Sequence, residues 1–553
     1  MNARYLTSWV RALRDEKAID VASVGVAYNE EYFDVGFAKM MRRSLDAANL
    51  SHVATIAPDS TGPTMWSIVD AIQSDEEFSE SIDVVGTHCP GAINNTTQPP
   101  PNAASLLQPL WSTEQHIGET GLVGSRSGYN NKSFDDLPVW DTRAALGIAR
   151  VINQGYITAN QTATLLWTPV YSWYEHLLYA GKGLLVANTP WSGFYAPVDA
   201  LWMVAHTTQF AQPGWRFADN EGCRLLEDGQ GSVVTYYSPD NTDVSVVIET
   251  AQSVETNSLV LKVVLDRHIH SLHMWRTEPA KGTIFERQED LVLAKDGLVR
   301  LEIPPGIVLT LTTTTGQSKG TPASAIPAPA NFSDILPHHE DFEGVALDRM
   351  PRFTSDMHGV FSVNSVPGLG KVLEQRSVLP PVATHSIGAR ENNYATIIGD
   401  ASLVDYAVSI DARLCVEGGC CPTAKAGVWP AMIHTRFAPA GFVLRVEFPE
   451  QAGRNASWTV QAGKGDCGIG IDCKVVVVQR GEMSWRPGTW KRLSLAARRI
   501  NGGDHVNLTW SVGSSMQGEA TVESFPEARG AAALGSGLKN PRSQWDNLTI
   551  KKV

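Results

Sequence analysis

Short apolar runs alternate with helix-like stretches over the first two hundred residues, and this pattern constrains the fold most. Residues 19–27, 53–57 and 82–87 are apolar runs of strand length, and amphipathic stretches at 32–48 and 63–77 separate them. Strands that alternate with helices predict βαβ units and a parallel sheet. The carboxyl ends of parallel strands meet at one edge, so polar residues that follow these strands are expected to gather there.

The same pattern continues to about residue 215 and then stops. Further strands are expected at 110–112 and 163–170, with a helix at 143–154 between them. Beyond residue 215, strands and turn residues follow one another with little helical periodicity, which is typical of β-sandwiches. We therefore expect a βα region over 1–213, a β-sandwich over 214–315, a Pro-, Ala- and Ser-rich linker over 316–338, and a second sandwich of lectin-like size over 339–553.

Composition excludes several classes of protein. The 553 residues are 43% hydrophobic and 19% charged, which is enough apolar side chain to form packed cores and excludes wholesale disorder. The net charge of -13 repels phosphate backbones, so no nucleic-acid partner is expected. The longest apolar runs are far shorter than the ~20 residues of a transmembrane helix, and no transmembrane segment is expected.

Two features bear on the cellular compartment. Residues 1–16 have the spacing of an amphipathic helix and lack the apolar core and cleavage site of a signal peptide, so none is expected in this chain. The density of Asn-x-Ser/Thr acceptors nevertheless favours a glycosylated protein of the secretory route. These acceptors are Asn49, Asn94, Asn95, Asn131, Asn160, Asn331, Asn455, Asn507 and Asn547.

Five of the 7 cysteines lie near the C-terminal end, and they favour disulfides over a metal site. They are Cys415, Cys420, Cys421, Cys467 and Cys473. Pairs among them suit an oxidising compartment. Neither a Cys-x-x-Cys nor a His-x-x-x-His spacing accompanies them, so we expect neither a metal nor a cofactor.

Two carboxylates stand where a strand meets its following loop. Glu30 follows the run that ends near residue 27, and Glu114 follows the run that begins at residue 110. Glycoside hydrolysis needs such a pair, because one carboxyl group protonates the leaving oxygen while the other, ionised, attacks the anomeric carbon. The alternative is that each residue only favours the N-terminus of a following helix.

Four other residues are candidates for binding substrate. The amide of Asn29, next to Glu30, could hydrogen-bond a sugar hydroxyl. Trp167, toward the end of a strand, could stack on the apolar face of a sugar, although core packing is the usual role of a tryptophan. His88 and Asp59 also follow strands, where they could bind hydroxyl groups or simply cap a turn.

These residues lie in motifs that resemble those of the galactocerebrosidases, glycoside hydrolase family 59. The matching segments are 28–30 (YNE), 110–114 (LWSTE), 152–157 (INQGYI), 166–167 (LW), 190–193 (PWSG), 205–210 (AHTTQF), 212–215 (QPGW), 249–250 (ET), 309–316 (LTLTTTTG) and 544–548 (QWDNL). The resemblance covers nearly the whole chain and becomes weaker after the linker.

The resemblance implies a fold and roles for the site residues. The family has a (β/α)8 TIM barrel, a β-sandwich and a lectin-like sandwich of the concanavalin A/laminin G kind. Glu30 would be the acid/base at the end of barrel strand four, and Glu114 the nucleophile at the end of strand seven. Asn29 and Trp167 match substrate contacts. The first strand here already carries the acid/base residue, so we expect an N-terminally incomplete barrel of about strands 4–8.

The resemblance also implies a function, with alternatives left open. It implies a retaining β-galactosidase acting on galactosylceramide and related galactosyl lipids, with a lipid-presenting activator protein as a partner and a lysosomal or secreted location. The alternatives are a related retaining glycosidase that acts on β-galactosides or arabinosides of polysaccharides, and a non-catalytic module that binds carbohydrate or lipid.

Overall fold

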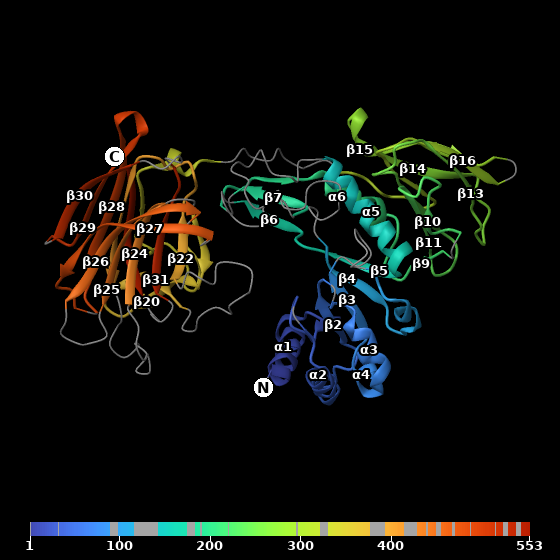
Figure 1. Cartoon of the computed structure of the whole chain (residues 1–553), viewed down its shortest axis with the longest axis horizontal. Coiled ribbons are helices and arrows are strands. Elements are labelled where there is room, and N and C mark those ends of the chain that lie inside the picture. The colour runs from blue at the N-terminus through green and yellow to red at the C-terminus, as the bar shows by residue number, and fades with distance from the viewer. Residues whose placement is uncertain are drawn as a thin grey trace.

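The structure is a computed structural model of the whole chain. It describes residues 2–553 except 31, 63, 89–97, 116–141, 174–182, 189–190, 219–220, 295–296, 321–329, 377–392, 414–428, 438–440, 449–454, 467–470, 487, 515, 524–528 and 538–542. Figure 1 shows a group of helices and strands near the N-terminus and two groups made mainly of strands.

The N-terminal part contains the predicted parallel sheet. Its order is β1-β2-β3-β4-β5, and all four neighbouring pairs are parallel. The strands are β1 (Ser23–Gly25), β2 (Ala54–Ser60), β3 (Val84–His88), β4 (Leu110–Gln115) and β5 (Gln161–Leu166). This sheet has the connectivity of half a (β/α)8 barrel, so the expected fold class of an incomplete barrel joined to β-sandwiches is confirmed.

Four helices pack with the sheet through one apolar core, and a fifth, α5 (Thr142–Ala159), is buried in a separate cluster. The four are α1 (Asn2–Lys17), α2 (Val35–Ala47), α3 (Ser67–Ser74) and α4 (Glu76–Glu80). Met41 and Leu45 of α2 and Ile68 of α3 are fully buried against Val26 and Val85 from the strand side. Met41 and Leu45 lie on the face that helical periodicity predicts to be buried, whereas Met40, expected on the same face, is 49% exposed.

Local capping decides where two of these helices begin. The Asp34 carboxylate accepts a hydrogen bond from the Phe37 amide at 2.7 Å and caps α2. The stretch at 63–77, expected as one helix, is two, because Asp75 adopts an extended backbone and caps α4 through the Phe78 amide at 3.0 Å. A capping aspartate thus ends the first helix and begins the next.

The register of the sheet is irregular near its carboxyl edge. Between β2 and β3 the pairing shifts between Pro58 and Ser60, and between β3 and β4 it shifts between Thr87 and His88. The second shift places His88 opposite Glu114 instead of opposite Thr113. Such bulges re-aim side chains, and here they do so where the polar residues lie.

The chain between β5 and the next sandwich differs from the expectation. The strand expected at 163–170 ends at Leu166 and resumes at Val170 as part of a separate three-stranded sheet. That sheet consists of β6 (Val170–Trp173), β7 (Leu185–Asn188) and β8 (Tyr195–Pro197), and α6 (Asp199–Thr208) follows it. The pattern did not separate the two strands, because residues 163–170 form one short, mainly apolar run.

The middle of the chain forms the expected β-sandwich. Its larger sheet has the order β10-β11-β12-β17-β14-β15, with β9 paired to β11, and β13 pairs with β16. The strands are β9 (Arg216–Phe217), β10 (Arg224–Leu225), β11 (Ser232–Tyr237), β12 (Val244–Glu249), β13 (Asn257–Lys262), β14 (Ser271–Glu278), β15 (Thr283–Val292), β16 (Leu298–Ile303) and β17 (Val308–Thr312).

Helices α5 and α6 pack on this sandwich. Ile148 of α5 and Met203 of α6 are fully buried in one cluster with Val234 of β11 and Val247 of β12. The buried Asn153 side chain donates to the carbonyl oxygen of Val247 at 3.1 Å. The helix that connects β4 to β5 is therefore held by the sandwich as well as by its own sheet.

The C-terminal part is a second, larger sandwich. One sheet has the order β20-β21-β32-β23-β28-β29-β30, with β18 paired to β32, and the other has the order β19-β22-β31-β24-β25-β26-β27. The strands of the first sheet are β18 (His338–Glu340), β20 (Phe361–Val366), β21 (Gly370–Gln375), β23 (Tyr406–Arg413), β28 (Lys491–Ile500), β29 (His505–Val512), β30 (Met516–Glu523) and β32 (Gln544–Lys552). Those of the second are β19 (Thr354–His358), β22 (Asn393–Ile398), β24 (Trp429–Phe437), β25 (Phe442–Phe448), β26 (Ala456–Asp466), β27 (Ile471–Met483) and β31 (Ala531–Gly537).

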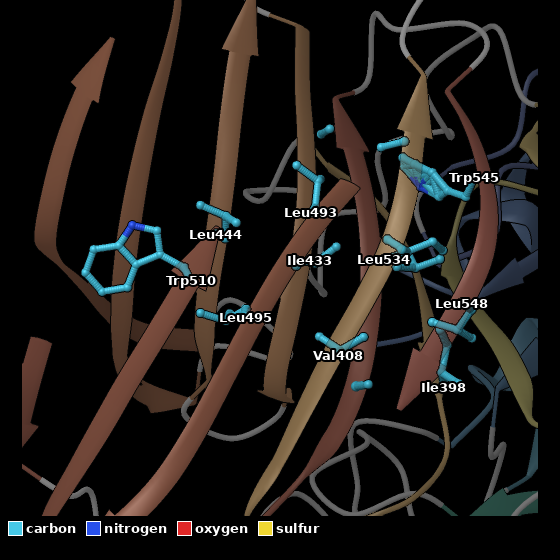
Figure 2. Close-up of a cluster of buried hydrophobic side chains, with 14 of the residues drawn as sticks. Ile398, Val408, Ile433, Leu444, Leu493, Leu495, Trp510, Leu534, Trp545 and Leu548 are labelled. Carbon is cyan, nitrogen blue, oxygen red and sulfur yellow. The ribbon is translucent and has the colours of Figure 1, made fainter. Parts of the chain in front are cut away.

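Side chains from both sheets fill the space between them. Figure 2 shows Val408 and Leu495 of the first sheet meeting Ile433, Leu444 and Leu534 of the second. These five side chains are fully buried. Alternate residues along each strand point inward, as expected for two sheets packed face to face.

Two further expectations from the sequence concern membrane-spanning helices and disulfides. Within the described residues, no helix is both long and apolar enough to cross a bilayer. The predicted disulfides cannot be placed, because Cys415, Cys420, Cys421 and Cys467 lie outside the described residues and only the backbone of Cys473 is described, in β27.

Candidate active site

The structure brings four of the predicted site residues together at the carboxyl edge of the parallel sheet. Glu30 lies in the turn after β1, Asp59 near the end of β2, His88 at the end of β3 and Glu114 near the end of β4. The Glu30 amide donates to the Asp59 carbonyl at 2.9 Å, which ties the turn after β1 to β2. Four neighbouring strands thus each present one titratable side chain to the same place.

His88 is the centre of this group. Its side chain is 6% exposed, and its Nε2 lies 3.2 Å from Asp59 Oδ1, within hydrogen-bonding distance. The same nitrogen lies 3.7 Å from Glu114 Oε2, and the other nitrogen, Nδ1, lies 3.6 Å from Glu30 Oε1. The imidazole therefore stands within ion-pair reach of three carboxylates.

The backbone at two of these residues is unusual. Glu30 has a φ of 63° and Asp59 a φ of 52°, in the left-handed region that non-glycine residues rarely adopt. Each such conformation costs on the order of 1–3 kcal/mol and persists only where surrounding contacts impose it. Both residues lie beside the same histidine, so the contacts that impose these conformations are concentrated at this edge.

The two glutamates are close enough to act on one bond. One oxygen from each and one His88 nitrogen lie within 4.8 Å of one another. Three such ligand atoms could in principle surround a cation. However, the imidazole turns Nδ1 toward Glu30 and Nε2 toward Glu114 and Asp59, so different nitrogens face the two glutamates. We therefore assign no metal to this cluster.

The charges of the cluster shift two pKa values in opposite directions. Burial lowers the pKa of His88, but the hydrogen bond with Asp59 and the charges of Glu114, Asp59 and Glu30 outweigh burial and raise it above its ordinary value. Burial raises the pKa of Asp59, but hydrogen bonds with the His88 and Thr113 side chains and the charge of His88 together outweigh burial and lower the pKa. The structure therefore favours a protonated imidazole beside an ionised Asp59.

The remaining two predicted residues lie beside the cluster. Asn29 has an exposed side chain in the turn after β1. Trp167 is half-buried in the bend after β5, and its amide donates to the carbonyl of Gln115 at 3.1 Å, one residue beyond Glu114. Both positions border the carboxyl edge, and the role of each in binding stays a prediction.

One residue that supports the site was missed at the sequence level. Gly86 lies within β3, and a Cβ there would collide with the Thr113 side chain and lie 2.7 Å from Ile56 Cγ2. Thr113 directly precedes Glu114, so Gly86 allows β4 to carry its side chains close against β3. A glycine inside an apolar strand was the available signal, because it often marks a close approach.

Two carboxylates at neighbouring strand ends of a half-barrel are the arrangement that glycoside hydrolysis requires, and Glu30 and Glu114 face one imidazole here. Comparison with protein families agrees, since residues 1–209 match the model described as Glycosyl hydrolase family 59. The chain is therefore a glycoside hydrolase similar to family 59.

Individual relatives extend the similarity beyond residue 209. The galactocerebrosidase of Danio rerio is 28% identical over 580 residues, which cover 100% of this chain and 77% of that protein. The galactocerebrosidase of Mus musculus is 30% identical over 445 residues, which cover 75% of this chain and 58% of that protein. Among solved structures, a glycoside hydrolase family 30 subfamily 8 xylanase from Clostridium acetobutylicum is 17% identical, with a TM-score of 0.41 over 56% of this chain and 70% of the xylanase chain.

Proposed function

We propose that the protein is a retaining β-galactosidase that hydrolyses galactosylceramide and related galactosyl lipids to galactose and ceramide. The observation that carries this proposal is the placement of Glu30 and Glu114 around His88, with one oxygen of each glutamate within 4.8 Å of the other. The family and the galactocerebrosidase relatives support the substrate class.

The separation of the glutamates supports the retaining course. Retaining glycosidases hold their two carboxyl groups about 5–5.5 Å apart, whereas inverting enzymes leave about 6.5–9.5 Å for a water molecule. In the first step, Glu114 attacks the anomeric carbon while Glu30 gives a proton to the departing oxygen. In the second, Glu30 takes a proton from water, which attacks the same carbon and releases Glu114.

The exposures of the two side chains fit these roles. The Glu114 side chain is 19% exposed and the Glu30 side chain 48% exposed. The attacking group must lie beneath the sugar, whereas the acid/base must reach both a leaving group and water. Glu114 is thus suited to be the nucleophile and Glu30 the acid/base, with Asn29 and Trp167 as sugar contacts.

Two further proposals rest on the expected substrate. A galactosyl lipid is embedded in a bilayer, so a lipid-presenting activator protein is a reasonable partner for an enzyme that takes it. We also propose a lysosomal or secreted location, which the number of glycosylation acceptor triplets supports.

The five-strand parallel sheet favours a second candidate, a module that binds carbohydrate or lipid without catalysis. A barrel closes only when all its strands pair, and in the described residues β1 pairs within the sheet only with β2. Turnover separates this candidate from the first. A panel of galactosylceramide, aryl β-galactosides and aryl arabinosides also tests the related polysaccharide glycosidase.

The decisive experiment replaces the proposed nucleophile. We expect Glu114→Gln to abolish hydrolysis of an aryl β-galactoside, because an amide cannot form the glycosyl-enzyme bond. The first-formed sugar, observed by NMR, should be the β-anomer. Glu80→Gln, at an exposed end of α4, is the matched control and should keep wild-type rates. An active Glu114→Gln enzyme, or an α-anomer as first product, contradicts the proposal.

A further inference from the structure

We propose that His88, anchored by Asp59, is a positioning residue that keeps the Glu114 carboxylate ionised and fixes its distance from Glu30. The inference rests on the proposed function, because it concerns the same two glutamates. It gives His88 a task different from the sugar contact expected from its place after a strand.

The first step of the argument is the anchoring. His88 ends β3, its side chain is only 6% exposed, and the Asp59 carboxylate lies 3.2 Å from Nε2. A buried ring held at one nitrogen cannot rotate freely without breaking that contact. Asp59 is itself fixed by its left-handed backbone and by its carbonyl, which accepts from the Glu30 amide. The orientation of the ring therefore follows from the backbone.

The second step is the spacing. With the ring fixed, Nδ1 faces Glu30 at 3.6 Å and Nε2 faces Glu114 at 3.7 Å. These distances are longer than hydrogen bonds but within the reach of an ion pair, so the ring acts on both carboxylates through its charge. Catalytic contacts often tighten only when substrate is bound. The imidazole thus lies between the two carboxylates and sets their separation.

The third step is charge. Within the part of the chain that the structure describes, the titratable groups that face His88 are Asp59, Glu114 and Glu30, all of them acidic. Three neighbouring carboxylates repel one another, and a protonated imidazole between them compensates this repulsion. The pKa of His88 is raised, so the cation is fully present below the ordinary value of about 6.5 and is lost only as pH rises through the higher, folded-state value.

The experiment uses the full chain and two amide variants. We expect His88→Gln and His88→Asn to lower kcat/KM for a soluble aryl β-galactoside on the order of 100-fold, with KM changed much less. The acid limb of the pH profile should move to higher pH, because the carboxylate that must be ionised loses its neighbouring cation. A merely structural role would lower kcat and leave the acid limb in place, and that result overturns the inference.

A matched control lies near the opposite end of the neighbouring strand. His52 Nε2 is 3.3 Å from Asp20 Oδ1, an exposed histidine–aspartate pair just before β2 begins. His52→Gln should change neither the rate nor the acid limb. If the His52 variant moves the limb as far as the His88 variants do, the effect is general and the inference fails.

A second measurement does not depend on turnover. NMR titration of the His88 ring should show its pKa falling in both Asp59→Asn and Glu114→Gln relative to the wild type. An unchanged pKa in either variant overturns the inference. An active Glu114→Gln enzyme contradicts the proposed function as well, whereas an inactive one combined with wild-type rates in the His88 variants removes only the inference about His88.

Discussion

Gly86 shows how the absence of a side chain supports the active-site edge. A Cβ at this position would overlap the Thr113 side chain, which comes from the adjacent strand and directly precedes Glu114. Close approach of β3 and β4 at this point therefore depends on glycine. We expect Gly86→Ala to lower the free energy of unfolding by about 1–3 kcal/mol, because the strands must separate to admit the methyl group.

The neighbouring part of the sheet offers a control for this prediction. Gly25 in β1 has no atom within 4 Å of a Cβ built on it. Gly25→Ala should change the free energy of unfolding by no more than about 0.5 kcal/mol. Urea unfolding followed by tryptophan fluorescence measures both. Equal values for the two variants would show that the contact with Thr113 is not what requires a glycine.

Helix α6 is fixed to the middle sandwich by a buried histidine. His206 is completely buried, with Nε2 2.8 Å from the Thr277 hydroxyl of β14 and Nδ1 2.8 Å from the Thr310 hydroxyl of β17. Burial lowers its pKa to about 3. Because the unfolded chain has an ordinary histidine pKa of about 6.5, it binds the proton that the folded state excludes, and stability falls as pH falls below about 6.5.

Replacing this histidine should therefore weaken the pH dependence of stability. We expect the loss of unfolding free energy between pH 7 and pH 5 to be smaller in His206→Gln than in the wild type, as measured by urea unfolding at each pH. Glu249 contributes the opposite slope, because burial raises its pKa, but it is common to both proteins. The exposed His270→Gln should keep the wild-type slope, and the same slope in His206→Gln would refute the prediction.

The elements show what the sequence could and could not predict. The strands that carry Asp59, His88 and Glu114 were predictable, because short apolar runs that end in polar residues are typical of buried strands leading into loops. The meeting of these residues at one edge followed from parallel pairing alone. Their arrangement around His88 was not predictable. It depends on the β-bulge between Thr87 and His88, and no local sequence pattern indicates that bulge.

The sequence also could not predict which surfaces pack against the predicted helices. The sequence pattern predicted a helix at 143–154 but not the surface that covers it. That surface includes Val234 and Val247 of the sandwich, which lie much later in the chain. The effect of Asp75 was also not predictable from the sequence. A single aspartate within a helical pattern is tolerated inside some helices, but here Asp75 ends α3 and caps α4.

At the scale of the whole molecule, the C-terminal sandwich has a core of its own. Its buried cluster runs from Phe332 to Ile550 and includes no described residue from outside that range. We expect residues 330–553 alone to fold and to unfold cooperatively in urea, as followed by near-ultraviolet circular dichroism. Residues 1–209 alone should not, because α5 and α6 would lose their contacts with the sandwich. Cooperative unfolding of the 1–209 piece would contradict this division.

The cluster that α5 and α6 share with β11 and β12 has a consequence for heat denaturation. Ile148 and Met203 lie before residue 213, and Val234 and Val247 lie after it, yet they occupy one core. Melting the sandwich strands would uncover the helices, and melting the helices would uncover the strands. Calorimetry of the full chain should therefore show α5 and α6 melting in one endotherm with the middle sandwich, with the C-terminal sandwich giving its own. Shared cores therefore set the boundaries of the units that unfold on heating. These boundaries need not coincide with residue 213, where the sequence pattern changes from alternating helices and strands to strands alone.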